Sequence, residues 1–287
     1  MIQTAPLPSP ELRQRVSDFA PWVAEAQWSV LFGGRTNTAW QVSGTEQTLV
    51  LKLYRTSSAN PLFPNDAAAE AMMLAHLSGL GIAPELVASF DSSEGHCTLY
   101  HAIPGQPWRD GVAEIAAMMQ RLHGQAIPSG LRSLPNGSAE VLAHGDEILA
   151  RCKEHSDLAD LRPALDVPTT TQTVLLHCDM VPGNLITNAD GLHLIDWQCP
   201  GVGDPCEDIA IFLSPAMQGL YRGEALSLED RDLFLRHYPQ AAARYLELAP
   251  AYHYRMAAYC AWKVENGTPD YETGFRAEVA ALKEALR

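Results

Sequence analysis

One stretch of the chain, residues 175–208, constrains the fold more than any other. It reads LLHCDMVPGNLITNADGLHLIDWQCPGVGDPCED, and three polar side chains, Asp179, Asn184 and Asp196, interrupt its apolar runs. Residues 174–176 predict a short buried strand, followed by a tight loop in which Pro-Gly is the turn signal. Two further short strands, joined by a loop that ends in Asp-Gly, predict a hairpin.

This hairpin would bring three oxygen-bearing side chains together. Asn184 and Asp196 would lie on neighbouring strand ends, with Asp179 on the loop before them, so all three would face one small volume. Carboxylate and amide oxygens are ligands that magnesium prefers, and a carboxylate can also orient a hydroxyl group. The stretch therefore predicts a site that holds magnesium on a nucleotide beside a hydroxyl acceptor.

The same residues resemble a known family. The pattern His177-x-Asp179-x4-Asn184, with Asp196 twelve residues further on, is similar to the catalytic loop and metal-binding Asp of kinase-like small-molecule phosphotransferases. This family includes choline and ethanolamine kinases, aminoglycoside phosphotransferases and bacterial thiamine kinases. The segments HCDMVPGNLI and LIDWQCPGVGDPCEDIA resemble the choline kinase branch most.

The resemblance implies an α+β, two-lobed protein kinase-like fold. A small sheet-rich N-lobe would span residues 1–103 and bind the nucleotide. A larger helical C-lobe would span 104–287, with the lobe boundary at Pro104-Gly105. The implied reaction is transfer of the ATP γ-phosphate to a hydroxyl of a small molecule, with ATP and Mg²⁺ as cofactors.

The resemblance also assigns roles within the loop. Asp179 would accept or orient the acceptor hydroxyl, and Asn184 and Asp196 would hold magnesium. His177 and Asp208 would brace the loop by hydrogen bonds without touching the nucleotide. Cys178, beside the proposed base, is interpreted as a small filler residue in preference to a catalytic thiol.

A lysine inside an apolar strand marks the N-lobe. In QTLVLKLY (47–54), burial of Lys52 would be costly unless its ammonium group met an anion. The resemblance assigns Lys52 to the α/β-phosphates and pairs it with Glu70, in the helix expected over 66–80. The alternatives are a Lys52 that faces solvent on an edge strand and a solvated Glu70.

Two further N-lobe segments are candidates for nucleotide binding. The amides of Gly33 and Gly34, in a segment GGRTN similar to the glycine-containing loop of choline kinases, can approach phosphate oxygens. The alternative is an ordinary hairpin turn. Backbone groups near Tyr100 to Ile103 would hydrogen-bond to the adenine.

The C-terminal third is expected to be helical and to choose the acceptor. Tyr259 and Trp262 share a helix face, and aromatic faces bind quaternary ammonium groups by cation–π attraction. Choline kinases have an aromatic pair at comparable spacing, although packing aromatics would give the same pattern. Seven acidic residues against two arginines between 201 and 232 predict an acidic rim that favours a cationic acceptor.

The expected elements outside the site are mostly helices. A helix capped by Ser9 would run to about Ala20, and strands would flank the Gly-Gly turn and continue through 97–100. Further helices are expected at 112–124, 138–152, 156–172 (weaker), 209–217, 228–237, 240–246, 250–266 and 271–287.

Composition restricts the remaining possibilities. A chain of 287 residues with 47% hydrophobic and 19% charged residues is typical of a globular protein with a sizeable core. No apolar run is long enough to span a membrane, and the first residues do not have the pattern of a secretory signal. The six scattered cysteines predict reduced thiols and a cytoplasmic protein rather than disulfides.

Net charge and loop length exclude some partners. A net charge of −14 argues against nucleic acid and anionic membranes, and it suits a small cationic substrate. The segment from Asp196 to Asp208 is too short for a protein kinase activation segment and lacks Ala-Pro-Glu, which disfavours a polypeptide substrate. The remaining alternatives are an aminoglycoside or thiamine kinase and a non-catalytic nucleotide-binding protein. The oligomeric state is not predicted.

Overall fold

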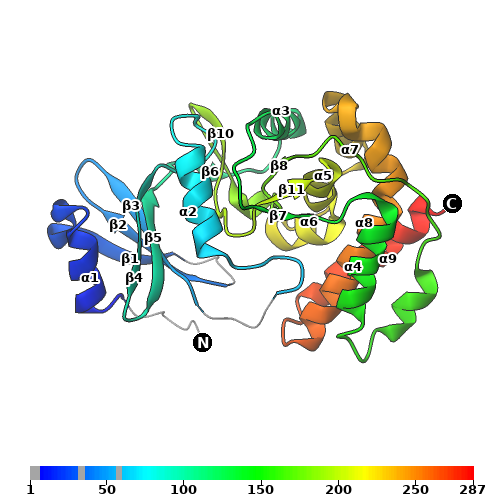
Figure 1. Ribbon diagram of the computed structural model, residues 1–287, viewed down its shortest axis with the longest axis horizontal. Helices are drawn as coiled ribbons and strands as arrows, with labels where there is room; N and C mark the ends of the chain where they lie inside the picture. Colours follow the sequence, from blue (N-terminus) through cyan, green and yellow to red (C-terminus); the bar gives the residue numbers. More distant parts are fainter. Residues whose placement is uncertain (1–6, 32–35, 56–59) are drawn as a thin grey trace. The chain divides into compact units, whose positions relative to one another are not determined.

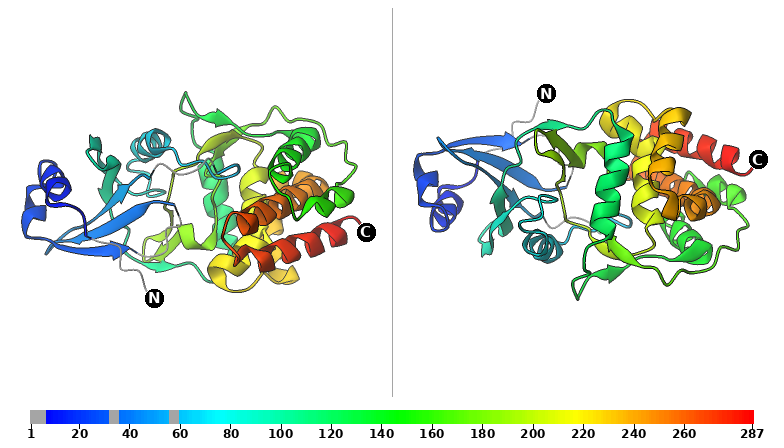
Figure 2. Two further views of the ribbon diagram at one scale, coloured as in Figure 1. Left: turned by 90° about the horizontal axis from the view of Figure 1, so that it is seen from below. Right: turned by 90° about the horizontal axis from the view of Figure 1, so that it is seen from above.

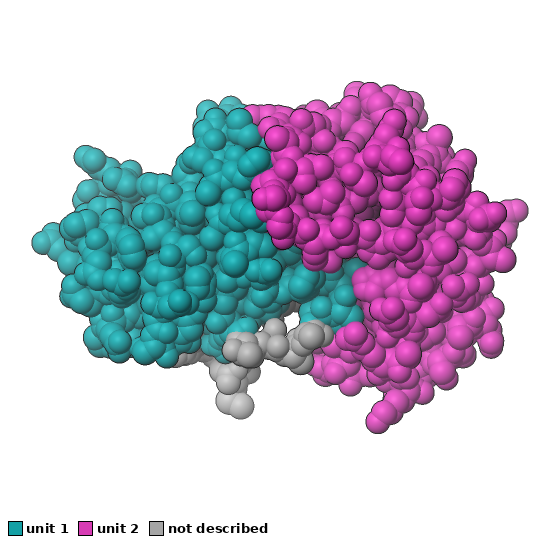
Figure 3. Space-filling model, viewed as in Figure 1, with its two compact units in different colours: residues 1–106, 186–199 teal, residues 107–185, 200–287 magenta. Residues whose placement is uncertain are grey.

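The computed structural model describes residues 7–31, 36–55 and 60–287. The chain forms two compact units, coloured separately in Figure 3: the first comprises 1–106 and 186–199, and the second comprises 107–185 and 200–287. The mixed α+β class expected from the sequence is present, with an antiparallel sheet in the first unit and mainly helices in the second.

The two units do not follow the expected division at 103/104. Residues 186–199 belong to the first unit, although the sequence interpretation placed them in the C-lobe. Backbone hydrogen bonds explain the difference: the Leu194 N–H donates to the Ile82 carbonyl at 2.8 Å, and the Asp66 N–H donates to the Gln198 carbonyl at 2.9 Å.

The first unit is built on a five-stranded antiparallel sheet with strand order β1-β2-β3-β5-β4. Its strands are β1 (Gln27–Leu31), β2 (Thr38–Ser43), β3 (Thr48–Leu53), β4 (Leu86–Ser92) and β5 (Gly95–His101). In the centre of the sheet, Leu51 pairs with Trp40 on one side and Leu99 on the other. β3 is therefore an interior strand, and a lysine on it is not on a sheet edge.

A helix covers each face of this sheet (Figures 1 and 2). Helix α1 (Pro10–Ser17) begins as expected, because Ser9 Oγ accepts the Leu12 N–H at 3.1 Å. Its residues Leu12 and Val16 join the apolar core of the sheet. The helix ends at Ser17, before the expected end at about Ala20, and the 3₁₀ helix η1 (Pro21–Glu25) follows. Helix α2 (Ala67–His76) packs on the other face, against β4 and β5.

A second, smaller sheet has the order β10-β9-β6. The predicted hairpin is present as β9 (Leu185–Asn188) and β10 (Gly191–Leu194), and β6 (Gln106–Pro107) lies beside β9. Asn184 lies just before this hairpin, in the short helical turn η3 (Pro182–Asn184).

The second unit is mainly helical. Its helices are α3 (Val112–His123), α4 (Gly137–Leu149), α5 (Cys206–Leu213), α6 (Pro215–Arg222), α7 (Leu228–His237), α8 (Pro239–Glu265) and α9 (Tyr271–Ala285). Helices α4, α8 and α9 lie side by side (Figure 2). A small sheet of β7 (Arg132–Ser133), β11 (Gly201–Gly203) and β8 (Val174–Leu176) has the order β7-β11-β8.

Three helix predictions were wrong. The segment 156–172 contains only the 3₁₀ helix η2 (Ser156–Leu161), because Pro163 and Pro168 each lack a backbone N–H and restrict the preceding residue. The expected helix 209–217 is two helices, because Ser214 caps α6 and Pro215 begins it. Conversely, α8 continues through Pro250, whose position in the helix is buried, so packing offsets one lost hydrogen bond.

Membrane-spanning helices and disulfides are both absent from the described part of the chain. Within 7–31, 36–55 and 60–287, no helix has the length and apolar character needed to cross a membrane. No disulfide joins any of the six cysteines, all of which lie in these ranges.

Candidate active site

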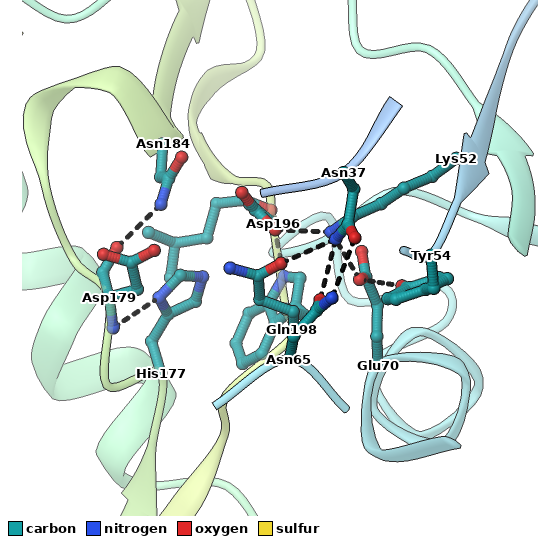
Figure 4. A network of polar contacts seen from close by, with 12 residues as sticks. Asn37, Lys52, Tyr54, Asn65, Glu70, His177, Asp179, Asn184, Asp196 and Gln198 are labelled. Atoms are coloured by element: carbon teal, nitrogen blue, oxygen red, sulfur yellow. Dashed lines mark hydrogen bonds and ion pairs between the residues drawn. The ribbon is translucent and has the colours of Figure 1, made fainter. Parts of the chain in front are cut away.

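In the first unit, the ammonium group of Lys52 lies between two carboxylates (Figure 4). Its Nζ is 2.6 Å from Glu70 Oε2 and 2.5 Å from Asp196 Oδ1. The ion pair predicted between Lys52 and Glu70 is therefore present, and Asp196 is a second partner that the sequence did not indicate. Lys52 and Glu70 are both buried, whereas the Asp196 side chain is 29% exposed.

Local structure explains how these groups meet. Lys52 is on the interior strand β3, and α2 covers the face towards which Lys52 points. Asp66 caps α2 by accepting the Ala69 N–H at 2.9 Å, which fixes where the first turn places Glu70. Burial alone would lower the pKa of Lys52, but Asp196 and Glu70 together outweigh this effect and raise that pKa. Lys52 is therefore a cation at neutral pH.

Asp196 follows β10 in an unusual backbone conformation, with φ of +65°. Two residues later, the Gln198 side chain accepts from Asn37 Nδ2 at 2.9 Å. Asn37 and Asn65 also exchange two amide hydrogen bonds of 2.8 Å each. This amide cluster joins three segments: Asn37 lies just before β2, Asn65 lies just before α2, and Gln198 lies two residues after Asp196.

In the second unit, a tight loop holds the proposed base. The Asp179 N–H donates to His177 Nδ1 at 3.2 Å, and Asn184 Nδ2 donates to the Asp179 carbonyl at 2.9 Å. Both bonds are visible in Figure 4. Because its nitrogen is used in this bond, Asn184 presents its amide oxygen as the atom suited to a cation. Asp179 and Asn184 are 9% and 8% exposed.

Asp208 makes the bonds expected of a residue that braces this loop. Its carboxylate accepts the Cys178 N–H at 2.7 Å and the His177 N–H at 3.0 Å. His123 Nε2, at the end of α3, lies 3.1 Å from the same group. Burial alone would raise the pKa of Asp208, but the His123 contact and the loop bonds hold it below its usual value. Asp208 is therefore an ionised acceptor at neutral pH.

Two small residues shape the turn around Asp179. Cys178 has φ of +61°, is buried, and has a pKa raised by burial, so it is a protonated filler as interpreted from the sequence. At Gly183, an added Cβ would lie 2.7 Å from the ring of Tyr221 on α6. A side chain at this position would displace either the ring or the loop.

The expected nucleotide-contacting backbone is partly described. Gly33 and Gly34 lie outside the described residues. Tyr100 is buried in β5, and the sheet already uses the neighbouring amides: the His101 N–H donates to Glu85 and the Ala102 N–H to Thr48, each at 2.9 Å. Within the segment expected to contact the adenine, residues 100–103, Ile103 follows the last residue that makes these backbone bonds.

The predicted aromatic pair lies beside a lysine of the protein itself. Tyr259 and Trp262 stack with ring centroids 6.0 Å apart, and Tyr271 meets Tyr259 edge-on at 5.9 Å. Lys263 Nζ lies 5.2 Å from the Tyr271 centroid and 6.0 Å from the Trp262 centroid. This arrangement favours the alternative interpretation, in which the aromatics pack within the protein rather than forming an open cage.

The expected acidic rim is smaller than the sequence suggested. Of the seven acidic residues in 201–232, three are buried and paired with cationic or histidine side chains. They are Asp204 with Arg244, Glu207 with Arg255, and Asp208 with His123. A count along the sequence cannot separate such buried pairs from exposed charges.

The donor set fits magnesium held mainly by its nucleotide. Among the residues that the structure describes, no group of three or more His, Cys, Asp or Glu side chains could bind a metal. Magnesium usually takes one or two protein oxygen ligands and completes its shell with phosphates and water. The Asp196 carboxylate in the first unit and the Asn184 amide oxygen in the second unit are each oxygen ligands of this kind.

Several polar residues of the site were not predicted from the sequence. Tyr54, Asn65, Gln198 and His123 have partners 16 to 161 residues away in the chain. The one available signal was position: Tyr54 is two residues after Lys52, and Gln198 is two residues after Asp196.

Comparisons with known proteins identify structures of similar fold. The chain is similar to a choline/ethanolamine kinase family protein from Mesorhizobium loti, with 15% identity, a TM-score of 0.68, and coverage of 96% of this chain and 94% of that one. It is also similar to the choline kinase LicA from Streptococcus pneumoniae, with 19% identity, a TM-score of 0.64, and coverage of 95% and 98%.

A variant of the aminoglycoside phosphotransferase APH(4)-Ia, in ternary complex with AMP-PNP and hygromycin B, gives 13% identity, a TM-score of 0.64, and coverage of 95% and 98%. At these identities the likeness shows a kinase-like fold. No curated protein sequence matches the chain. The sequence model of the phosphotransferase enzyme family matches residues 27–248, most of the chain, so this protein belongs to the phosphotransferase enzyme family.

Proposed function

We propose that this protein transfers the γ-phosphate of ATP to a hydroxyl group of a small molecule. The observation that carries the proposal is the buried Lys52 between Glu70 and Asp196. A buried ammonium group held by two carboxylates is costly to maintain for stability alone. It is suited to a phosphate, because an ammonium group has three N–H donors and the carboxylates use two of them.

Each site residue has a role in this proposal. Lys52 binds the α/β-phosphates, and Glu70 fixes its position. Asp196 and Asn184 would hold Mg²⁺, which would neutralise negative charge on the phosphates when bound. Asp179 orients the acceptor hydroxyl, while His177 and Asp208 keep its loop in shape. Backbone groups from Tyr100 to Ile103, and the amides of Gly33 and Gly34, complete nucleotide binding.

The family match supports a role for each of these residues in the reaction. It spans 27–248 and thus includes Lys52 and Glu70 as well as Asp179, Asn184 and Asp196. AMP-PNP, an ATP analogue, is bound in the APH(4)-Ia complex, which supports ATP as the donor here. The absence of disulfides among the six cysteines supports a cytoplasmic location, where ATP is abundant.

Two acceptor classes remain in the proposal. Similarity to choline and ethanolamine kinases, together with the net charge of −14, favours a small cationic alcohol such as choline or ethanolamine. Lys263 beside the rings of Trp262 and Tyr271 favours an acceptor that does not need an aromatic cage, such as an aminoglycoside or thiamine. A coupled ADP-release assay with choline, ethanolamine, thiamine and hygromycin B separates these classes.

The test of the reaction itself is Asp179→Asn, assayed with the best acceptor from that panel. The substitution keeps the side-chain shape but removes the charge that aligns the hydroxyl. A positioned base contributes ~10²–10⁴-fold to rate, so kcat should fall by about that factor. Affinity for AMP-PNP with magnesium should barely change, because Lys52, Asn184 and Asp196 are intact.

Two results would contradict the proposal. A wild-type protein that turns over ATP with none of the four acceptors and does not bind AMP-PNP would argue for a different activity. A near-normal kcat in Asp179→Asn would remove Asp179 from the role of base.

A further inference from the structure

Tyr54 lies next to the phosphate-binding lysine without an assigned role. It follows β3 directly, two residues after Lys52, so strand alternation directs both side chains to the face that α2 covers. Its backbone N–H donates to the His96 carbonyl at 2.9 Å, which continues the sheet pairing past the end of the strand. The Tyr54 side chain is buried.

The phenol contacts both members of the buried ion pair. Its hydroxyl donates to Glu70 Oε2, the same oxygen that lies 2.6 Å from Lys52 Nζ. The Tyr54 ring centroid is 5.1 Å from Lys52 Nζ. In Figure 4, Lys52 on β3 and Tyr54 just after it both point towards Glu70.

The charges in this cluster explain why a neutral donor is useful. Glu70 and Asp196 carry two negative charges against one positive charge on Lys52. A buried carboxylate needs hydrogen-bond donors, and a second cation would compete with Lys52 for Glu70. Burial raises the pKa of Tyr54, so its phenol keeps its proton and stays a donor at neutral pH.

We propose that Tyr54 is a positioning residue, which holds Glu70 and the Lys52 ammonium group in the place where Lys52 meets the nucleotide phosphates. The inference rests on the proposed function, because it takes Lys52 as a phosphate ligand. The hydroxyl of Tyr54 shares the Glu70 oxygen with Lys52, and the ring limits where the ammonium group can move. Tyr54 itself does not touch the nucleotide.

The variant Tyr54→Phe tests this role, because it removes one oxygen atom and keeps the ring. Affinity for AMP-PNP with magnesium, measured by calorimetry, should fall about 5- to 10-fold. This is less than the full effect of one hydrogen bond to a charged group, because Tyr54 acts through Glu70 and Lys52 and does not touch the nucleotide. The KM for ATP should rise with it, while the KM for the acceptor stays unchanged.

Two controls separate positioning from stability. Tyr245→Phe removes another buried tyrosine hydroxyl, in α8 of the second unit, and should lower the melting temperature without changing AMP-PNP affinity. In a Lys52→Met background, Tyr54→Phe should have no further effect on AMP-PNP binding, because Tyr54 acts through Lys52.

The outcomes distinguish the inference from the function on which it rests. Wild-type protein that fails to bind AMP-PNP would overturn both. Wild-type protein that binds AMP-PNP, with a Tyr54→Phe variant of equal affinity, would overturn only the role of Tyr54. So would an effect of Tyr54→Phe that persists in full in the Lys52→Met background.

Discussion

At the scale of single residues, two backbone conformations help to set the geometry of the site. Among the described residues, Cys178 and Asp196 are the only non-glycine residues with positive φ. The left-handed region costs a non-glycine residue roughly 1–2 kcal/mol, although Asp and Asn tolerate it better than most. Cys178 directly precedes Asp179, and Asp196 pairs with Lys52. Strain therefore lies at Asp196 and at the residue directly before Asp179, the two acidic residues to which we assign the chemistry.

Substitutions at Asp196 can separate its charge from its backbone conformation. Asp196→Asn keeps a residue that tolerates positive φ but removes the carboxylate that a hard cation requires. We expect Asp196→Asn to bind AMP-PNP with little dependence on Mg²⁺ and to be less stable than the wild type, because the buried Lys52 keeps only one of its two carboxylate partners. Asp196→Ala should lose the same magnesium dependence and be destabilised by roughly 1–2 kcal/mol more, because Ala does not tolerate positive φ.

Calorimetric titration of AMP-PNP with and without Mg²⁺, together with thermal unfolding of the three proteins, measures both effects. Asp66→Asn, at the cap of α2, is the control for removal of an acidic side chain elsewhere in the first unit. An unchanged magnesium dependence in Asp196→Asn would mean that the cation binds through other groups.

The residues that the sequence could predict are those with a local signal. Lys52 interrupts an apolar strand, Glu70 lies one turn into a capped helix, and Asp179 and Asn184 lie at a recognisable spacing. Tyr54 and Gln198 carry no such signal, because each is defined by a partner that only the fold brings near. The Asp196 contact with Lys52 was missed for the same reason: the two residues are 144 positions apart.

At the scale of elements, the loop that carries Asp179 is held by α5, which follows it in the chain, and by α3, which precedes it. Asp208, in the first turn of α5, accepts both backbone bonds from the loop, and His123 at the end of α3 contacts the same carboxylate. The Tyr238 hydroxyl lies 2.7 Å from the other ring nitrogen of His123, Nδ1. The loop shape therefore depends on one buried carboxylate.

We predict that Asp208→Asn destabilises the protein and lowers kcat. An amide accepts through one oxygen only, so at least one charged hydrogen bond is lost, worth about 1.5–3 kcal/mol. The looser loop should misplace Asp179 more than it affects nucleotide affinity. Urea unfolding gives the free energy, and steady-state kinetics give the split between kcat and the KM for ATP.

The same pair of proteins should show a defined pH dependence. Because the pKa of Asp208 is lower in the folded state than its usual value near 3.9, its contribution to stability is complete above about pH 4. It is lost as the pH falls through the lower folded value. The difference in unfolding free energy between wild type and Asp208→Asn should therefore be largest at pH 7 and shrink at acid pH.

Asp160→Asn, at an exposed position, should show no such difference at any pH. A deficit of Asp208→Asn that grows as the pH falls would contradict the assignment of an ionised Asp208 brace.

Helix boundaries could be predicted from the sequence only where the signal is local. Caps at Ser9 and Asp66 are local and were found, and both accept the backbone bonds that define them. Pro250 was expected to begin a separate helix, but it lies inside α8, whose neighbours α4 and α9 pack along it. Only tertiary contacts decide whether a proline ends a helix or is tolerated within it.

At the scale of the whole molecule, the chain passes between the two compact units three times, at 106/107, 185/186 and 199/200. The segment 186–199 is thus contributed to the first unit from a distant part of the sequence. It brings Asp196 to Lys52, Gln198 to Asn37, and the His193 ring to within 2.9 Å of the Gly81 carbonyl. A sequence division at 103/104 cannot represent this exchange, because it assumes that each lobe is continuous.

This connectivity predicts that the first unit cannot fold from its continuous segment alone. A fragment of residues 1–106 lacks the partners of Ile82, Asp66 and Lys52, and leaves the buried Lys52–Glu70 pair without its third member. The same fragment joined to 186–199 through a Gly/Ser linker of about 15 residues, which reaches on the order of 20 Å, regains all of these partners.

Only the joined protein should unfold cooperatively in urea and show near-UV circular dichroism. A joined protein with the order of residues 186–199 scrambled is the matched control for length and composition, and should behave like the fragment. If 1–106 alone unfolds cooperatively with the same urea midpoint as the joined protein, the segment 186–199 does not contribute to the stability of the first unit.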